Sequence, residues 1–521
     1  MALDIKMENI LSINSMGENE TSVVVENDII IPDNKPDITK ILYVDMFAKI
    51  PLAQMTKGKI ITEGEIAVKI IYLSEEDGGI IQSTESEIKY LCDMDIKNAQ
   101  QDMKYSIKSK VVHAEYEIIN SRRISINAIV KVEGEALNFE EKNIVCDIKE
   151  AEDIEILKTQ NMYYSYKGTE KENITVTEKL EIPDSTPNIF EIIHCDVKVE
   201  PATVNTTAGK IILNGKIIMS TLYTSNDNDE GIESIQHEIP YSNIMDMSIV
   251  QEKSKVLNNT KIISVKTYPE QDKDGQMRII NTEIVLEADI TIYEHSEAII
   301  INDIYGTKSD ILLKKQEMTM LVRVEEMHEI VNTSSIITIG GEESGIYQIF
   351  NMIAKPGEIN VNKQNDKILI EGEIETSVIY LPEARDVKAA SAKGKMNYSC
   401  EIPYENLKIP YECAIDVCIE NSSYNVISSN EVEVRASIKI TELIRKSIKA
   451  EVVTDIEEKP FDKQRIMNQP SMVIYFVQNN DSLFSIAKRY SALKKDILKA
   501  NNLDGEELFP GQQLIIPKKA I

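Results

Sequence analysis

The sequence predicts a mainly β protein with three tandem β-rich units, each carrying one short helix, followed by a small α+β module. Three observations support this fold class. A long segment recurs in the chain with unchanged internal spacing. The recurring segments alternate apolar and polar residues, as half-buried strands do. The composition changes after residue 451. The chain has 521 residues, 42% of them hydrophobic, which is enough for several separate cores.

The repeat is clearest between the first two units. Ile31-Pro32-Asp33 recurs as Ile182-Pro183-Asp184, and the segment 58–66 (GKIITEGEI) recurs in the same register as 209–217 (GKIILNGKI). A third copy has drifted. Residues 367–374 (KILIEGEI) repeat the same segment, but the Ile-Pro-Asp motif is missing, and residues 340–345 (GGEESG) lie near its place.

Within a unit, Ile66, Val68, Ile70 and Tyr72 lie on one face of a predicted strand, which favours a sandwich or barrel. A glycine recurs inside this strand, at Gly64, Gly215 and Gly372. Glycine within a strand indicates a bulge or a close backbone approach more often than a ligand site.

One short helix per unit is expected after Pro36, Pro187 and Gly345. In the first unit, Ile38, Ile41 and Leu42 have the spacing of a helix face. The predicted divisions are an N-terminal segment (1–24), three repeats (25–150, 170–300 and 325–450), a linker (451–471) and a terminal module (472–518).

The terminal module has several motifs in order: residues 475–487 (YFVQNNDSLFSIA), 497–503 (ILKANNL) and 508–517 (LFPGQQLIIP). Asp481 or Ser482 can cap a helix, and Pro510-Gly511 can turn the chain into a last strand, which predicts a βααβ unit. This segment resembles a LysM domain, except that Asn480 replaces the usual glycine.

The resemblance implies a groove between two loops that binds N-acetylglucosamine polymers or, in a cytosolic protein, a protein partner. Asp481 and Ser482 could equally be helix caps, and Leu483 is expected in the core. The predicted groove residues are Asn479, Asn480, Asp481, Ser482, Leu483, Asn501, Leu508, Phe509, Pro510 and Gly511.

The net charge and the absence of certain motifs disfavour several classes of function. The net charge of −29 disfavours general nucleic-acid binding, because phosphate contacts need clustered Lys and Arg. The sequence has no phosphate-binding loop or nucleophile elbow, and the five histidines lack metal-ligand spacing, so we expect no catalytic residue, metal or cofactor. The segment 226–231 (NDNDEG) is similar to a calcium loop, but His237 replaces the required Glu, so it is interpreted as a hairpin loop.

The N-terminus shows no signal peptide, no stretch is long and apolar enough to span a membrane, and the six cysteines form no Cys-x-x-Cys pair. These features predict a cytoplasmic protein with reduced thiols.

Because of its repeat motif and its LysM motifs, the whole chain resembles the SPOCS/LysM proteins of spore-forming clostridia. This resemblance implies a non-enzymatic role in spore coat assembly at the forespore surface, in the mother-cell cytosol. The implied partners are a SpoIVA-like coat morphogenetic ATPase, bound through LysM, and other coat proteins. Two alternatives remain: a peptidoglycan-binding protein of the cell wall or cortex, and a glycan hydrolase with LysM as its targeting module.

Overall fold

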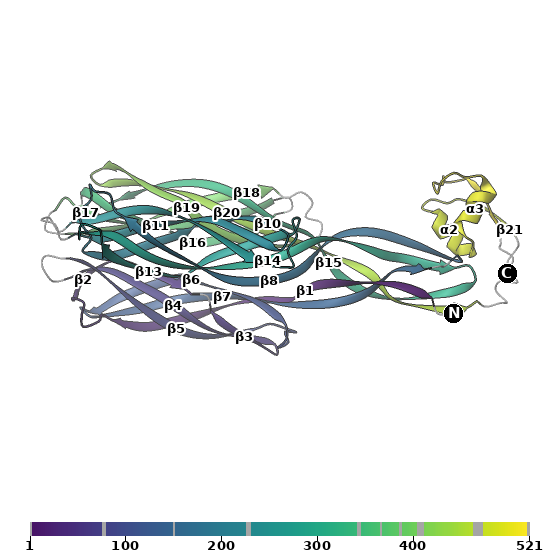
Figure 1. Cartoon of the computed structure of the whole chain (residues 1–521), viewed down its shortest axis with the longest axis horizontal. Helices are drawn as coiled ribbons and strands as arrows, with labels where there is room; N and C mark the ends of the chain where they lie inside the picture. Colours follow the sequence, from purple (N-terminus) through teal and green to yellow (C-terminus); the bar gives the residue numbers. More distant parts are fainter. Residues whose placement is uncertain are drawn as a thin grey trace.

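The computed structural model describes residues 3–49, 51–74, 80–149, 152–225, 231–340, 345–364, 367–384, 388–403, 411–461 and 472–517. Three β units lie side by side, and a long extension of paired strands connects them to the terminal module (Figure 1). The mainly β fold with three repeats and a terminal βααβ module is confirmed. Residues 462–471 of the predicted linker, residue 518 and residues 226–230 of the hairpin loop lie outside the described residues.

Unit 1 is a sandwich of two antiparallel sheets, with the strand orders β1-β7-β6 and β2/β3-β4-β5. Val68, Ile70 and Tyr72 lie in the core between these sheets, so the predicted alternating strand is confirmed. Its strands are β1 (Asp4–Ile30), β2 (Ile38–Ala48), β3 (Leu52–Thr56), β4 (Lys59–Ser74), β5 (Ile81–Asp95), β6 (Lys104–Asn120) and β7 (Arg123–Lys149).

Units 2 and 3 repeat this arrangement, each around its own core. In unit 3 one long strand, β16, pairs along β17 and takes the place of two strands in the other units. The strands of unit 2 are β8 (Ile154–Glu181), β9 (Glu191–Val199), β10 (Thr203–Thr207), β11 (Lys210–Thr224), β12 (Ile232–Asp246), β13 (Lys255–Gln271) and β14 (Met277–Gly306). Those of unit 3 are β15 (Ser309–Thr338), β16 (Ile346–Lys363), β17 (Lys367–Pro382), β18 (Ala390–Pro403), β19 (Tyr411–Ser428) and β20 (Glu431–Pro460).

The predicted helix in each unit is wrong, because strands β2, β9 and β16 occupy those positions. In β2 the register against β4 shifts between Ile38 and Lys40 and again between Ile41 and Tyr43. Each bulge adds a residue and changes which side chains face inward. Two bulges in succession therefore produce a helix-like spacing of buried residues within a strand.

The predicted divisions also need correction. The first strand of each unit begins before the predicted repeat, at Asp4, Ile154 and Ser309. Residues 451–460 belong to β20 and not to a linker. These long strands extend beyond the sandwiches because they pair with each other over their full length.

The extension, here called the stalk, consists of the N-terminal halves of β1, β8 and β15 and the C-terminal halves of β7, β14 and β20. All three strand pairs share its core, in which Ile10, Ile300 and Met318 pack together from units 1, 2 and 3. Register shifts at Ser15/Gly17, Ile292/Tyr293 and Leu321/Arg323 lie near the point where the stalk leaves the sandwiches. No unit could bury its stalk strands alone, so the three units form one structure.

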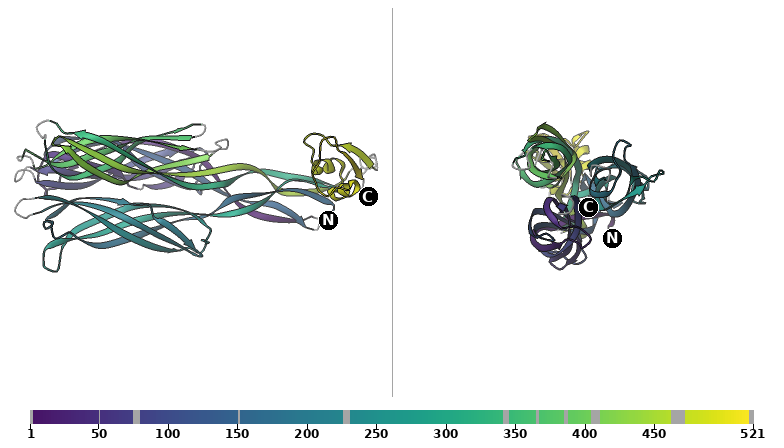
Figure 2. Two further views of the ribbon diagram at one scale, coloured as in Figure 1. Left: turned by 90° about the horizontal axis from the view of Figure 1, so that it is seen from above. Right: turned by 90° about the vertical axis from the view of Figure 1, so that its left-hand side faces the viewer.

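The sandwiches surround a common axis, seen end-on in the right panel of Figure 2. Strand β5 contacts β9, β12 contacts β16, and β18 contacts β2, so each unit contacts the next in the same way. A shared core, here called the junction, fills the centre with apolar residues of all three units.

Three buried polar residues occupy equivalent positions beside the junction. Tyr43, His194 and Asn351 face Ile71, Leu222 and Ile379 on the neighbouring strands. The Tyr43 and His194 rings lie 6.4 Å apart between centroids. Among the described residues, His194 Nδ1 and Asn351 Nδ2 have no hydrogen-bond partner. Burial lowers the pKa of His194 to about 3, so the ring is neutral at neutral pH.

The Ile-Pro-Asp motif forms a loop held by an arginine from the facing hairpin. Arg122 donates hydrogen bonds to the Pro32 carbonyl and the Asp37 carboxylate. Arg278 binds the Pro183 carbonyl of unit 2 in the same way. Unit 3 has Asn430 at this hairpin position, where its Oδ1 accepts a bond from the backbone N–H of Gly345. The motif and its arginine are therefore lost together in unit 3.

Candidate functional site

The terminal module consists of β21 (Met472–Phe476), α2 (Leu483–Tyr490), α3 (Lys494–Asn501) and β22 (Gln513–Pro517). Its two groove loops lie side by side. The Gly511 N–H donates to the Val477 carbonyl (2.8 Å), and the Val477 N–H donates to the Gln512 carbonyl (2.9 Å). Both loops need left-handed backbone, at Asn480 (φ 68°) and Gly511 (φ 85°). Asn adopts this conformation more readily than most residues, so the turn forms without the usual glycine.

The polar residues at the start of α2 serve the fold. Asp481 accepts hydrogen bonds from the Tyr475 hydroxyl (2.7 Å) and the Gln478 N–H (2.8 Å). These bonds, the first above all, lower the pKa of Asp481. Ser482 caps α2 in a reciprocal capping box with Ser485. Of the two interpretations of these residues, the contacts favour a structural role.

Other predicted groove residues also face inward. Leu483 is buried in the module core, and Leu508 packs against it. The Asn501 amide donates to the carbonyls of Ile497 and Ile515 and accepts from the Ile515 N–H, which ties α3 to β22. The residues left exposed in the two loops are Asn479, Asn480, Ser482, Phe509, Pro510 and Gly511. Phe509, with 68% of its surface exposed, is the largest apolar side chain among them.

A second exposed surface of the module was missed by the sequence interpretation. Met472, Ile474 and Phe476 are each more than half exposed on one face of β21, and these three residues are here called the apolar face. Every second residue of this strand, Val473 and Tyr475, packs against the core, so the sequence alternation could have indicated that the residues between them face outward. Large exposed apolar surfaces commonly mark sites of contact with other proteins.

The module packs onto the tip of the stalk (Figure 1). The rings of Tyr305 and Phe484 meet edge to face at 5.1 Å between centroids, and the Tyr305 hydroxyl donates to the Ala492 carbonyl (2.9 Å). The Lys488 ammonium pairs with Asp303 at 2.6 Å. Burial raises the pKa of Tyr305. These contacts involve α2 and the residues between the helices, so both groove loops and the apolar face remain open.

We expect Tyr305→Ala to release the module from the stalk. The substitution removes the ring contact and the hydrogen bond, and deleting a buried aromatic side chain costs about 3 kcal/mol. Small-angle X-ray scattering of the full chain should then show a broader distribution of particle lengths, with both parts still folded. Tyr268→Ala is the control, since Tyr268 lies exposed on the sandwich of unit 2. An unchanged scattering profile would show that Tyr305 does not hold the module.

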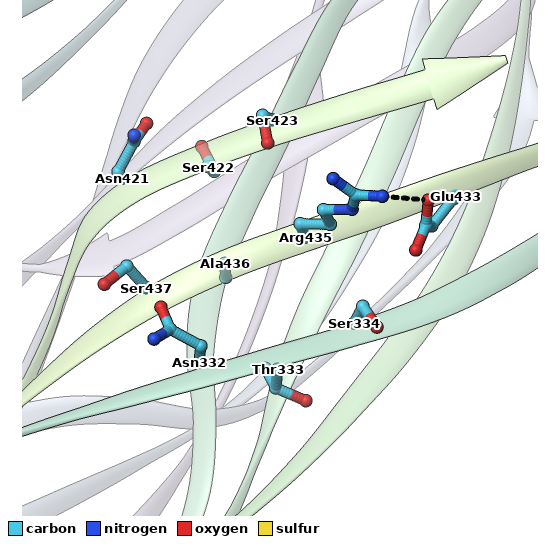
Figure 3. A pocket seen from close by; sticks show the side chains of 10 residues that line it. All are labelled: Asn332, Thr333, Ser334, Asn421, Ser422, Ser423, Glu433, Arg435, Ala436 and Ser437. Carbon is cyan, nitrogen blue, oxygen red and sulfur yellow. Dashed lines mark hydrogen bonds and ion pairs between the residues drawn. The ribbon is translucent and has the colours of Figure 1, made fainter.

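Unit 3 carries a shallow polar depression of about 470 Å³ (Figure 3). Within it, Arg435 pairs with Glu433 at 2.6 Å. The other lining residues are amide, hydroxyl and alanine side chains: Asn332, Thr333, Ser334, Asn421, Ser422, Ser423, Ala436 and Ser437. The depression thus holds one carboxylate, already paired, whereas glycoside hydrolysis generally needs two.

The described residues contain no cluster of His, Cys, Asp or Glu that could hold a metal ion. Within the same residues, no helix is long and apolar enough to cross a membrane. The six cysteines are free. Cys195 lies beside His194 in sequence, but its Sγ contacts Thr221 and Thr267.

Comparison with known families gives two matches. The family described as "SipL, SPOCS domain" matches residues 37–119, 188–269 and 345–427, one segment in each unit. The LysM domain family matches residues 475–517. No curated protein and no solved structure matches the chain.

The architecture is that of a sporulation-related protein with a peptidoglycan-binding type of domain at its end, and both domain families are non-catalytic. The chain belongs to the SipL-like SPOCS/LysM proteins, with three SPOCS domains followed by one LysM domain.

Proposed function

We propose that the chain is a non-enzymatic assembly protein of the spore coat, acting in the mother-cell cytosol at the forespore surface. Its LysM domain binds a SpoIVA-like coat morphogenetic ATPase, and the SPOCS units contact other coat proteins. The observation that carries the proposal is the apolar face of β21, which stays exposed although the module is docked on the stalk. Protein partners commonly bury aliphatic surface of the kind that Met472 and Ile474 offer here.

The second candidate is binding of an N-acetylglucosamine polymer. It is supported by the two adjacent loops, where Asn479 and Asn480 offer amide groups and Phe509 offers an exposed ring. The two candidates use different surfaces of one small domain, so substitutions can separate them.

The test measures binding of the full chain to a purified SpoIVA-like ATPase, with muropeptides as competitor. We expect Ile474→Ser to weaken ATPase binding at least about tenfold, because it removes buried apolar contact from the interface. Phe509→Ser in the groove loop is the matched control and should leave ATPase binding unchanged.

Three results would count against the proposal: no ATPase binding, displacement of the ATPase by muropeptides, or insensitivity to Ile474→Ser. Tight muropeptide binding that Phe509→Ser abolishes would favour the glycan candidate. Circular dichroism of both variants would establish that the module remains folded.

A further inference from the structure

The outward face of the β3-β4-β5 sheet in unit 1 carries an apolar patch. Leu52 is 75% exposed, Leu91 73% and Ile61 47%, and these three residues are here called the unit 1 patch. Leu52 and Leu91 are the two residues paired across the strands with Glu63, and Ile61 lies two positions along the same strand. Residues two apart on a strand share a face, so the three side chains lie around Glu63 on one face of the sheet.

The fold does not require this patch. At the positions of Leu52, Glu63 and Leu91, unit 2 has Thr203, Asn214 and Ser242, and unit 3 has Asn360, Glu371 and Ser399. Ile61, in contrast, has apolar counterparts in both units, Ile212 and Leu369. Both units form the same sandwich with a polar row there. Two exposed leucines on either side of this central residue are therefore found in unit 1 and not in units 2 and 3.

Glu63 lies exposed between the two leucines. Among the described residues, no hydrogen bond or ion pair to its carboxylate is found, although nearby Glu65 pairs with Lys49 and Lys89. Leu52, Leu91 and Ile61 thus lie on three sides of an unpaired carboxylate, and any partner that covers this surface must compensate that charge. The partner must supply a positive charge at the centre and apolar contact around it, since an uncompensated buried charge is costly.

A second copy of the chain does not meet this demand through the same patch. Two such patches meeting face to face would bring carboxylates together, on molecules that each carry a net charge of −29. A lysine or arginine flanked by aliphatic side chains supplies both the positive charge for Glu63 and the apolar contact around it. Leu52 and Leu91 would exclude water from the ion pair and strengthen it.

We propose that the unit 1 patch docks a protein segment that places one Lys or Arg side chain on Glu63, with aliphatic side chains on either side. This surface lies on the first SPOCS unit and is separate from the LysM domain. The chain thereby has a second interaction surface, whose partner is defined by a basic residue in an apolar setting.

The experiment places a benzophenone amino acid at position 91 of the full chain and irradiates sporulating cells. Capture of some protein is not the readout; the cross-linked segment is mapped by mass spectrometry. We expect one segment that contains a Lys or Arg beside aliphatic residues. We also expect Glu63→Lys to reduce the cross-link at least about tenfold, because an attraction between close charges becomes a repulsion.

Unit 3 provides the matched control. Glu371 occupies the equivalent position, with Asn360 and Ser399 in place of the two leucines, so Glu371→Lys should leave the cross-link unchanged. Leu52→Ser should reduce it. Hydrogen exchange of β4 would show that each variant keeps the sheet.

Four results would overturn the proposal: a cross-link to a second copy, a contacted segment without Lys or Arg, equal effects of Glu63→Lys and Glu371→Lys, or no discrete product. None of these results depends on whether the LysM domain binds the coat ATPase.

Discussion

Replacing Gly215 with alanine should destabilise unit 2 by about 2 kcal/mol, although alanine in a strand usually costs less than glycine. A Cβ atom at position 215 would lie 2.5 Å from the ring of Tyr241. Tyr241 is the cross-strand partner of Gly215, and its buried ring lies over the glycine backbone. The ring has little room to move, because it belongs to the sandwich core.

Urea denaturation should show the loss as a lower midpoint with an unchanged slope. Gly231→Ala is the control, since a Cβ there would meet nothing within 4 Å. The double variant Gly215→Ala/Tyr241→Ala tests the cause. If the ring is the obstacle, adding Gly215→Ala to Tyr241→Ala should cost almost nothing. A full additional loss in the double variant would show that the strain has another origin.

The same pairing recurs as Gly64 with Tyr90 and Gly372 with Tyr398. A Cβ at either glycine would again lie within 2.5 Å of a tyrosine ring atom. The sequence interpretation offered a bulge or a close backbone approach at this glycine; the structure instead places the side chain of a cross-strand tyrosine over it. Substitution at any of the three should produce a loss of similar size.

Acid should destabilise the junction through His194. In the unfolded chain histidine binds a proton below about pH 6.5, whereas the buried ring in the folded protein stays neutral down to about pH 3. The unfolded state therefore binds more protons between these values, and stability falls as the pH falls. The slope approaches about 1.4 kcal/mol per pH unit, which gives a loss of about 2 kcal/mol between pH 7 and pH 5.

The charged groups acting on His194 partly oppose one another, because Lys69 and Lys355 lower its pKa while Asp196 raises it. Burial remains the largest cause. Urea denaturation at pH 7 and pH 5 should be compared with the non-titrating variant His194→Leu. The variant should lose about 2 kcal/mol less over this interval, whatever its stability at pH 7. An equal loss in both proteins would show that His194 does not cause the acid sensitivity.

The sequence predicted those parts of the fold that depend on local pattern. The repeats, the alternating strand of unit 1 and the LysM domain with its two helices follow from spacing that neighbouring residues determine. The helix predicted from Ile38, Ile41 and Leu42 was wrong, because bulges in β2 give buried strand residues the spacing of a helix face. The stalk could not be foreseen, since its core joins Ile10, Ile300 and Met318 from three different units.

The candidate site was predicted only in part, because local motifs identify loops but not the long-range contacts that orient side chains. Motif positions indicated which residues form the two loops, but not which way their side chains point. Asp481 and Asn501 face inward because hydrogen bonds to Tyr475 and to the Ile515 backbone hold them there. The unit 1 patch was not predicted because Leu52 and Leu91 lie far apart in sequence and come onto one face only by pairing on either side of Glu63.

The equivalent positions of Tyr43, His194 and Asn351 have an evolutionary consequence. Three separate identical subunits around an axis would have to place the same side chain at all three positions, so every mutation would act three times at once. Because the three copies are joined in one chain, that restriction does not apply here. Each copy can now change alone at the axis and on its outer face, while the other two copies maintain the structure.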